Sequence, residues 1–306
     1  MTALHVSNGD STDVPGTGLA QQVLYWRDSL HEGPVPEVGP EELRGIRARF
    51  LTEDLALLAE RDRVLEAARD GEYVLWFEAD LYDQLQIIQI LDRLAGLGVE
   101  PERITLICIG EYPGIARFGG LGELTADQLR ELPATKASAV LTSDALELAV
   151  DAWAAFRAPA PDRLAEIAAR RSGELRFLGE AFDRLGREYP STRDGLSLTE
   201  RRVLAAVASG ATDAGTAFVR AAARETRPYL GDTWCYLMME RLALAPVPLL
   251  TASDGRITCH TRLSLTDAGA QVLAGRRDHV GVDRWIGGVQ LPGWRWDEGA
   301  EVVMPW

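Results

Sequence analysis

Short hydrophobic runs in the N-terminal part of the chain alternate with longer segments of helical periodicity. The runs cover residues 4–7, 23–26, 73–77 and 104–109. The last two, YVLWF and ITLICI, are almost continuously apolar, which is typical of strands covered on both faces. Residues 40–68 and 81–94 repeat apolar side chains every three to four positions, as amphipathic helices do. Strands that alternate with helices predict a Rossmann-like α/β domain with a parallel sheet, three layers and right-handed crossovers.

The pattern changes after this α/β domain, which we expect to span residues 1–125. Residues 126–190 are helical segments broken at prolines and predict a helical connector. Residues 191–280 contain three helical segments followed by a hairpin-like segment, an order that predicts a winged-helix-like domain. The tail, residues 281–306, carries four tryptophans. It should pack back on the protein, because exposed indoles leave large apolar surfaces in water.

The composition is that of a globular protein. Of the 306 residues 46% are hydrophobic and 25% are charged. No run of about 18 apolar residues occurs, and the N-terminus lacks the features of a signal peptide, so we expect a cytoplasmic protein with no membrane partner. The net charge of −14 argues against indiscriminate nucleic-acid binding, which depends on lysine and arginine. Cys108, Cys235 and Cys259 are far apart without CxxC spacing, so neither a disulfide framework nor a cysteine zinc site is predicted.

Polar and ionisable groups cluster where the predicted strands end. They are Asn8, Gly9, Asp10 and Ser11 after the first strand, Arg27, Asp28, His31 and Glu32 after the second, Glu78, Asp80 and Asp83 after the third, and Glu111 after the fourth. Parallel strands bring their C-terminal ends to one edge of the sheet, where open α/β sheets bind ligands. We therefore expect these groups to converge beneath a rim loop formed by the glycine-rich residues 111–124. The structural alternative is that Asp10 and Asp80 only cap helices, that Glu78 is solvated, and that His31 pairs with Asp28 to hold a loop.

Two reactive chemistries fit such a cluster. Several carboxylates at one edge would hold Mg²⁺ or Mn²⁺, hard cations that prefer oxygen ligands, and act on a phosphorylated substrate. Alternatively, the sequence GDS resembles the nucleophile block of the GDS-type serine hydrolases. In that case Ser11 would attack, and the DxxH pair of Asp28 and His31 would supply the orienting group and the base. That family places its DxxH near the C-terminus, whereas here the pair follows the second strand.

Anion binding without catalysis is the third interpretation. The backbone amides around Gly9 would hold a small-molecule anion, with Arg27 or Arg117 as its counter-ion. Neither GxGxxG nor GxxxxGK[ST] occurs in the chain, so neither a dinucleotide fingerprint nor a P-loop is predicted.

Four motifs, LHVSNGDS, YWRDSLHEGPVP, WFEADLYDQLQ and the tail segment DRWIGGVQL, carry a family resemblance. Together they resemble the bacterial family named domain of unknown function 1835, in its long architecture with a C-terminal companion region, and they cover most of the chain. The resemblance implies an α/β N-terminal domain and a helical C-terminal one, but no activity, because none is established for the family. The third motif departs from the family pattern EHDLYDQ, since Ala79 stands where the family has histidine. This difference weakens the metal hypothesis slightly.

The residues favour a cytoplasmic enzyme that acts on a small polar, phosphorylated or nucleotide-like substrate. The reaction class would be hydrolysis or metal-assisted phosphoryl chemistry. His31 is the candidate acid/base, because the ordinary pKa of histidine, about 6.5, permits proton transfer near neutrality. Asp10, Asp28 and Glu78 would orient the substrate or bind the metal.

The alternative function is a metabolite sensor whose winged-helix-like domain binds DNA. The helix expected to read bases, around residues 231–245, has Arg241 as its sole cation. A recognition helix should present several Arg, Lys, Asn or Gln side chains. We therefore expect this domain to serve in packing or in a homodimer rather than in nucleic-acid binding.

Overall fold

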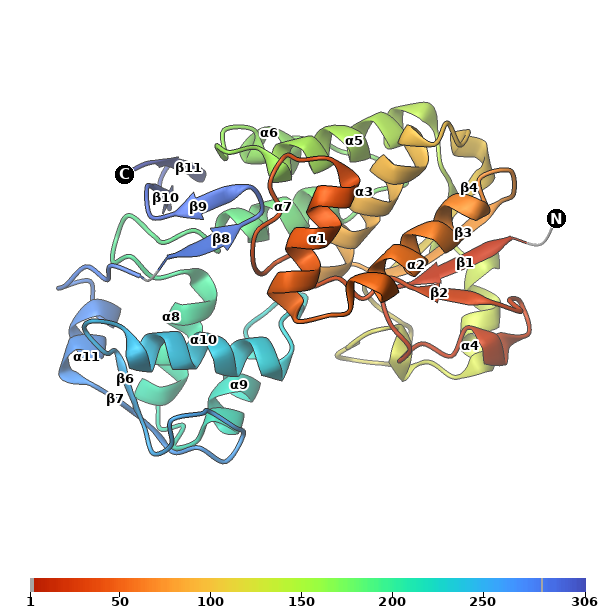
Figure 1. The fold of residues 1–306 in the computed structure, drawn as a ribbon. Helices are drawn as coiled ribbons and strands as arrows, with labels where there is room; N and C mark the ends of the chain where they lie inside the picture. The colour runs from red at the N-terminus through yellow and green to blue at the C-terminus, as the bar shows by residue number, and fades with distance from the viewer. Residues whose placement is uncertain (1–2, 282) are drawn as a thin grey trace. The chain divides into compact units, whose positions relative to one another are not determined.

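The computed structural model describes residues 3–281 and 283–306 and divides into two compact units (Figure 1). Unit 1 comprises the chain up to Phe182 together with Gly287–Val289, and unit 2 comprises Asp183–Ile286 together with Gln290–Trp306. The residues expected to form a connector are thus divided between the units, and the tail contributes a short segment to unit 1. No helix among the described residues is both long and apolar enough to cross a membrane.

Unit 1 is built on a five-stranded sheet with the order β2-β1-β3-β4-β5. Its strands are β1 (Leu4–Ser7), β2 (Val23–Tyr25), β3 (Tyr73–Glu78), β4 (Ile104–Ile109) and β5 (Ser138–Val140). The first four are parallel, with Val6 in register with Leu24 and Leu75, and β5 runs antiparallel to β4. The predicted α/β class with a mostly parallel sheet is confirmed. The edge strand β5 lies in a segment expected to be helical, and there the prediction is wrong.

Helices cover both faces of this sheet. The helices and 3-10 turns are η1 (Pro15–Thr17), α1 (Pro40–Leu51), α2 (Leu55–Ala67), α3 (Leu81–Gly96), η2 (Pro101–Arg103), η3 (Leu121–Glu123), α4 (Ala126–Glu131), η4 (Leu132–Ala134), α5 (Ser143–Arg157) and α6 (Leu164–Ala169). On one face α1 packs against α2, and α3 packs against α5 (Figure 1). On the other face α4 packs against η1. The next helix, α7 (Leu178–Gly186), spans the boundary between the units.

Side chains of β3 pack on both faces of the sheet, because they alternate in direction along the strand. On the first face the Tyr73 hydroxyl donates a hydrogen bond to the Leu65 carbonyl of α2 at 2.7 Å. On the second face Trp76 is fully buried in a cluster that includes Leu129 of α4. Glu78 has the same parity as Trp76, so its side chain leaves the end of the strand on this second face.

The single helix expected over residues 40–68 is two helices, α1 and α2. Thr52 ends α1 in a left-handed conformation with φ of 57°. Asp54 then begins α2, because its side chain accepts a hydrogen bond from the backbone N–H of Ala56. An aspartate in this position satisfies an N–H that the first helical turn leaves unpaired.

Unit 2 combines helices with short two-stranded sheets. Its elements are α8 (Leu198–Ala208), α9 (Ala214–Ala222), α10 (Asp232–Leu244), β6 (Leu250–Ala252), β7 (Leu263–Leu265), α11 (Asp267–Leu273), β8 (Arg284–Ile286), β9 (Val289–Leu291), β10 (Trp294–Asp297) and β11 (Val302–Pro305), with Val289 itself in unit 1. A capping box of Ser197 and Glu200 begins α8. Leu204, Met239 and Leu249 are fully buried or nearly so in its core. Three helices precede the antiparallel pair β6 and β7, but a winged-helix identity remains a prediction.

The tail is held by glycines that allow close backbone approach. In unit 1 the Gly287 carbonyl accepts a hydrogen bond from Val35 N–H at 2.8 Å, and Gly288 N–H donates to the Phe156 carbonyl at 3.0 Å. A Cβ on Gly288 would lie 1.8 Å from the Arg157 carbonyl oxygen, so any larger residue would displace the segment. In unit 2 the tail tryptophans differ, since Trp296 is 7% exposed and Trp306 is 65% exposed.

Candidate functional site

The strand order creates a topological switch point between β1 and β3. From β1 the chain turns through η1 to β2 on one side, whereas from β3 it continues through α3 to β4 on the other. Open α/β proteins bind ligands at such a point, in the crevice outside the carboxyl ends of the strands. Asn8 directly follows β1 and Glu78 ends β3, so both lie at this position.

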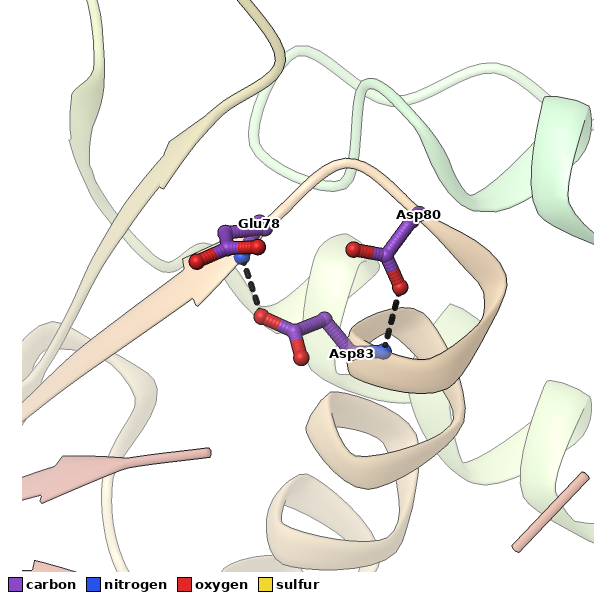
Figure 2. A group of neighbouring side chains, drawn as sticks. All are labelled: Glu78, Asp80 and Asp83. Atoms are coloured by element: carbon purple, nitrogen blue, oxygen red, sulfur yellow. Dashed lines mark hydrogen bonds between the residues drawn. The ribbon is translucent and has the colours of Figure 1, made fainter. Parts of the chain in front are cut away.

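Three carboxylates, those of Glu78, Asp80 and Asp83, gather at the switch point (Figure 2). Each offers one oxygen, and the three oxygens lie within 4.8 Å of one another. Asp80 caps α3, because its side chain accepts a hydrogen bond from Asp83 N–H at 3.1 Å. Asp83 accepts from the backbone N–H of Glu78 at 2.5 Å and from Asn8 Nδ2 at 2.8 Å. The bond from Asn8 ties the end of β1 to the first turn of α3.

The Glu78 carboxyl is held beneath the rim loop, where Leu121 N–H donates a hydrogen bond to its Oε1 at 2.7 Å. Gly120 has φ of 142°, and a Cβ there would lie 2.5 Å from Oε2 of Glu78. Only glycine therefore lets the loop approach so closely. Burial and then the charge of Asp80 raise the pKa of Glu78 to about 8, although the bond from Leu121 opposes this. Glu78 thus binds its proton at neutral pH unless a cation replaces it.

Asp83 is fully buried, and no arginine pairs with it among the residues that the structure describes. Burial raises the pKa of Asp83 well above its ordinary value, and the charges of Asp80 and Glu78 act in the same direction. The hydrogen bond from Asn8 opposes this increase in part. Two neighbouring carboxyls with raised pKa values take up either a proton or a cation.

Asp28 holds the loop after β2 in place. Its side chain is 1% exposed, and its Oδ1 accepts from Nε and Nη2 of Arg47 at 3.0 and 2.8 Å. The same guanidinium donates to the carbonyls of Glu32 at 2.7 Å and Ser29 at 2.9 Å, so α1 holds the whole loop. The hydrogen-bond partner of Asp28 in the structure is thus Arg47, and a pair of Asp28 with His31 stays a prediction.

His31 lies against the first turn of α3. Its ring meets the ring of Tyr82 edge-on, with centroids 5.7 Å apart. Burial raises the pKa of the Tyr82 hydroxyl to about 12, and the three carboxylates that reach it, those of Asp83, Asp28 and Asp80, act in the same direction. These carboxylates and the imidazole therefore surround one phenol.

Buried polar atoms without a hydrogen bond lie next to this phenol. Gln86 is fully buried on α3, and neither its amide nitrogen nor its amide oxygen has hydrogen-bond geometry to any described residue, although the amide is close enough to lower the pKa of Tyr82. Oδ2 of Asp28 is likewise buried without a hydrogen bond. Leaving such a group unpaired costs about 1–3 kcal/mol. Gln89 differs, because it accepts the indole N–H of Trp26 at 2.6 Å.

The other residues expected at the site are mostly exposed or half-buried. Asp10 and Arg27 pair with each other at 2.7 Å, and their side chains are 72% and 56% exposed. Asp10 caps none of the described helices, so that expectation is wrong. Ser11 is exposed and lies against the rim loop, since a Cβ on Gly122 would be 3.2 Å from the Ser11 Cβ. The remaining candidates are Gly9 and Glu32, which are half-buried, and Glu111 and Arg117, which are exposed.

The sequence patterns did not point to Arg47, Tyr82 or Gln86. A signal was present for the glutamine, because the segment LYDQLQIIQI places glutamines among apolar positions of one helix, and all of them are buried. Nothing in the sequence distinguishes Arg47 from the other arginines, since its partners come from a loop that precedes α1.

Comparison with known proteins adds no assignment. No protein-family model matches the chain, and no curated protein matches it significantly. The resemblance carried by the four motifs therefore stays a prediction, and function is inferred from the geometry of the site.

Proposed function

We propose that unit 1 is an enzyme that acts on a small polar substrate at the switch point between β1 and β3. The observation that carries this proposal is the pair of the half-buried Glu78 and the fully buried Asp83, two carboxyls with raised pKa values beside Asp80. No arginine pairs with either of the two among the described residues. Strongly perturbed carboxyls are typical of acid/base and metal sites, because burying uncompensated charge lowers stability.

The three carboxylates suit Mg²⁺ or Mn²⁺. Hard cations prefer oxygen ligands, and a bound cation would displace the protons of Glu78 and Asp83. Asp80 and Glu78 are only partly buried, whereas Asp83 is fully buried. A cation held by these residues would stabilise the charge of a phosphorylated or nucleotide-like substrate.

His31, Tyr82 and Glu78 supply the groups for proton transfer. Imidazole exchanges protons near neutrality, and the pKa of about 8 for Glu78 makes it an acid in the same range. Tyr82, whose pKa is raised to about 12, keeps its proton at neutral pH and would donate a hydrogen bond to a substrate. This set favours hydrolysis or phosphoryl transfer over redox chemistry.

Titration of Mn²⁺ into the full chain near neutral pH tests the metal part of the proposal. In two buffers of different ionisation enthalpy the measured heat should differ, because binding releases protons from Glu78 and Asp83. Asp80→Asn should weaken binding about tenfold or more. Asp127→Asn is the control, because Asp127 is an 84% exposed carboxylate in the first turn of α4. Absence of binding at millimolar Mn²⁺, or equal effects of the two changes, would contradict the metal site.

A thermal-shift screen tests the substrate class. Sugar phosphates and nucleotides, each with its phosphate-free counterpart, are compared with and without Mg²⁺. A substrate should raise the melting temperature of the wild type and not of Asp80→Asn. Turnover of that compound should fall roughly 10²- to 10⁴-fold in His31→Gln. A compound that binds without turnover under any of these conditions would favour a binding protein instead.

For unit 2 we propose a winged-helix-like domain used in packing or in a homodimer. The order of α8, α9, α10 and the β6–β7 hairpin supports this fold. Leu237 and Leu244 of α10 are exposed, and Arg241 is its only cation, a surface poorly suited to bases. Sub-micromolar, sequence-selective DNA affinity at physiological salt would favour the metabolite-sensing regulator. The cytoplasmic location and the homodimer remain predictions.

A further inference from the structure

Unit 2 contains a pocket of about 160 Å³ that none of the sequence motifs indicates. Its lining combines three arginines, a buried histidine and two tryptophans. We propose that this pocket binds a compact organic acid, that is, a carboxylate carried on a flat apolar body. The proposal does not depend on the chemistry at the switch point of unit 1.

His279 gives the first evidence of a ligand. It lines the pocket and is 6% exposed. Burial lowers the pKa of His279, and Arg295 and Arg284 act in the same direction against Glu200 and Asp278, so the ring is neutral at pH 7. Its backbone N–H donates to a carbonyl, but among the described residues its ring nitrogens make no hydrogen bond. A neutral imidazole has one donor and one acceptor, and in the pocket lining both can bond to a ligand.

Arg295 gives the second piece of evidence for a ligand. It is 6% exposed, and it is fixed by Asp278 at 2.5 and 2.6 Å and by the Ser191 carbonyl at 3.2 Å. These bonds leave donors of the guanidinium, including its Nε–H, without a partner among the described residues. An arginine held in this way is preorganised for a second acceptor, and guanidinium groups match the geometry of carboxylates.

The charge of the lining favours an anion. Arg241 and Arg284 join Arg295 in the pocket, against Glu200 and Asp278. Asp278 is already held by Arg295, and the Glu200 carboxylate accepts the Ser197 N–H in the capping box of α8. The lining therefore carries one more arginine than carboxylates, although the chain as a whole has a net charge of −14.

The apolar walls and the size define the rest of the ligand. Trp294, Leu291 and Pro292 line the pocket, and the Trp306 ring covers the Arg295 guanidinium, 4.2 Å from its carbon to the ring centroid. Indole faces favour flat apolar groups. The volume is below the roughly 300–1,000 Å³ of pockets that hold drug-sized ligands. A nucleotide or a peptide is therefore too large, whereas a single ring with a carboxylate is of suitable size.

Benzoate is the probe for the test, with benzamide as its uncharged counterpart, and acetate and inorganic phosphate as anions without a ring. Binding to the full chain is followed through the imidazole NMR signals. The chain has only four histidines, and His279→Gln identifies the signal of His279. Benzoate should shift this signal saturably, and benzamide should bind about 10- to 100-fold more weakly, as expected for loss of one charge-assisted hydrogen bond. This comparison uses the wild type, so it does not depend on whether a variant folds.

Two variants locate the site. Arg241→Gln should weaken benzoate binding about tenfold or more, whereas Arg277→Gln, an exposed arginine outside the pocket, should leave it unchanged. Benzoate binding that leaves the His279 signal unmoved, or equal losses in both variants, would overturn the proposal. So would benzamide binding as tightly as benzoate, acetate or phosphate binding more tightly, or no binding at millimolar benzoate.

Discussion

Unit 1 contains two groups of buried or half-buried carboxylates, and their hydrogen-bond partners are of opposite kinds. Asp28 and Asp62, each 1% exposed, are anchored by arginines. Arg47 holds Asp28, and Asp62 accepts bonds from Arg44, Arg61 and Arg93. Glu78 and Asp83 accept hydrogen bonds only from neutral N–H donors among the described residues, and both have raised pKa values. Asp28 and Asp62 are thus neutralised by arginines of the chain itself. Glu78 and Asp83, at the switch point, are left to bind a proton or a metal ion.

The largest expected effect is at the anchored group. Arg47→Met removes the cation that hydrogen-bonds to Asp28 and leaves this buried carboxylate with Arg61 alone, whose Nη1 lies 4.0 Å from its Oδ2. Breaking a buried pair in this way costs about 3–5 kcal/mol, because the remaining charge has no solvent to stabilise it. Urea unfolding followed by circular dichroism measures the free energy of unfolding.

Arg63→Met is the matched control for this change. Arg63 lies on the neighbouring helix α2 and pairs with Glu60, but its side chain is 67% exposed. Exposed pairs contribute little, so this variant should unfold like the wild type. A loss below about 1 kcal/mol for Arg47→Met would mean that Asp28 is not anchored as described.

The second largest effect concerns Glu78 and Asp83, which should make the free energy of unfolding depend on pH. The folded-state pKa of Glu78, about 8, lies above its ordinary value of 4.5. The folded protein therefore binds this proton more tightly, and the stability it contributes is complete below pH 4.5 and is lost as the pH rises through 8. Glu78→Gln should reduce the fall in stability between about pH 6 and pH 8 by about 2–3 kcal/mol. Urea midpoints measured at intervals of pH test this.

Glu147→Gln, a change at an exposed glutamate of α5, should leave the pH dependence as it is in the wild type. The raised pKa of Asp83 acts in the same direction as that of Glu78, so part of the slope should persist in Glu78→Gln. A wild-type stability that does not fall between neutral and mildly alkaline pH would contradict the assignment of buried, protonated carboxyls.

The strands and the position of the site follow from local pattern. The apolar runs at 4–7 and 104–109 coincide with β1 and β4, and the polar residues after β3 lie at the switch point as expected. Contacts between residues that are distant in sequence cannot be predicted from this local pattern. Arg47 reaches Asp28 from another element, and its choice depends on how α1 packs. The break at Thr52 was also missed, because the apolar period continues through it.

The third prediction compares two glutamines on α3. Gln86→Met, of similar volume, should raise the free energy of unfolding by about 1 kcal/mol, because it removes a buried amide that has no hydrogen bond. Gln89→Met should lower it by about 1–3 kcal/mol, since it leaves the Trp26 indole N–H unpaired. Thermal and urea unfolding of both variants test the difference in sign. Equal losses would indicate that bridging waters satisfy Gln86, and retained ligand binding in Gln86→Met would exclude the amide from the site.

The smallest expected effect is the energetic coupling between Asp28 and His31. A hydrogen-bonded pair would make Asp28→Asn and His31→Gln non-additive by roughly 0.5–3 kcal/mol. In the structure Asp28 bonds to Arg47 and His31 lies against Tyr82, so the coupling of these two changes should be smaller than the coupling of Asp28→Asn with Arg47→Met. The cycle of Asp28→Asn with Arg47→Met is the positive control and should be strongly non-additive.

The double-mutant cycle of Asp28 and His31 helps to distinguish a structural role of His31 from a catalytic one. If His31 only held its loop, His31→Gln would lower the free energy of unfolding by about 1 kcal/mol and leave any turnover intact. If it transfers a proton, the melting temperature should stay close to that of the wild type while turnover falls by roughly 10²- to 10⁴-fold. A coupling energy between Asp28 and His31 above about 1 kcal/mol would show that the two side chains interact in solution. His31 would then have a structural role in the loop, as Asp28 has. Additive stabilities together with lost turnover would place His31 with Glu78 and Asp83, because then its effect on rate would not arise from the loop that Arg47 already holds.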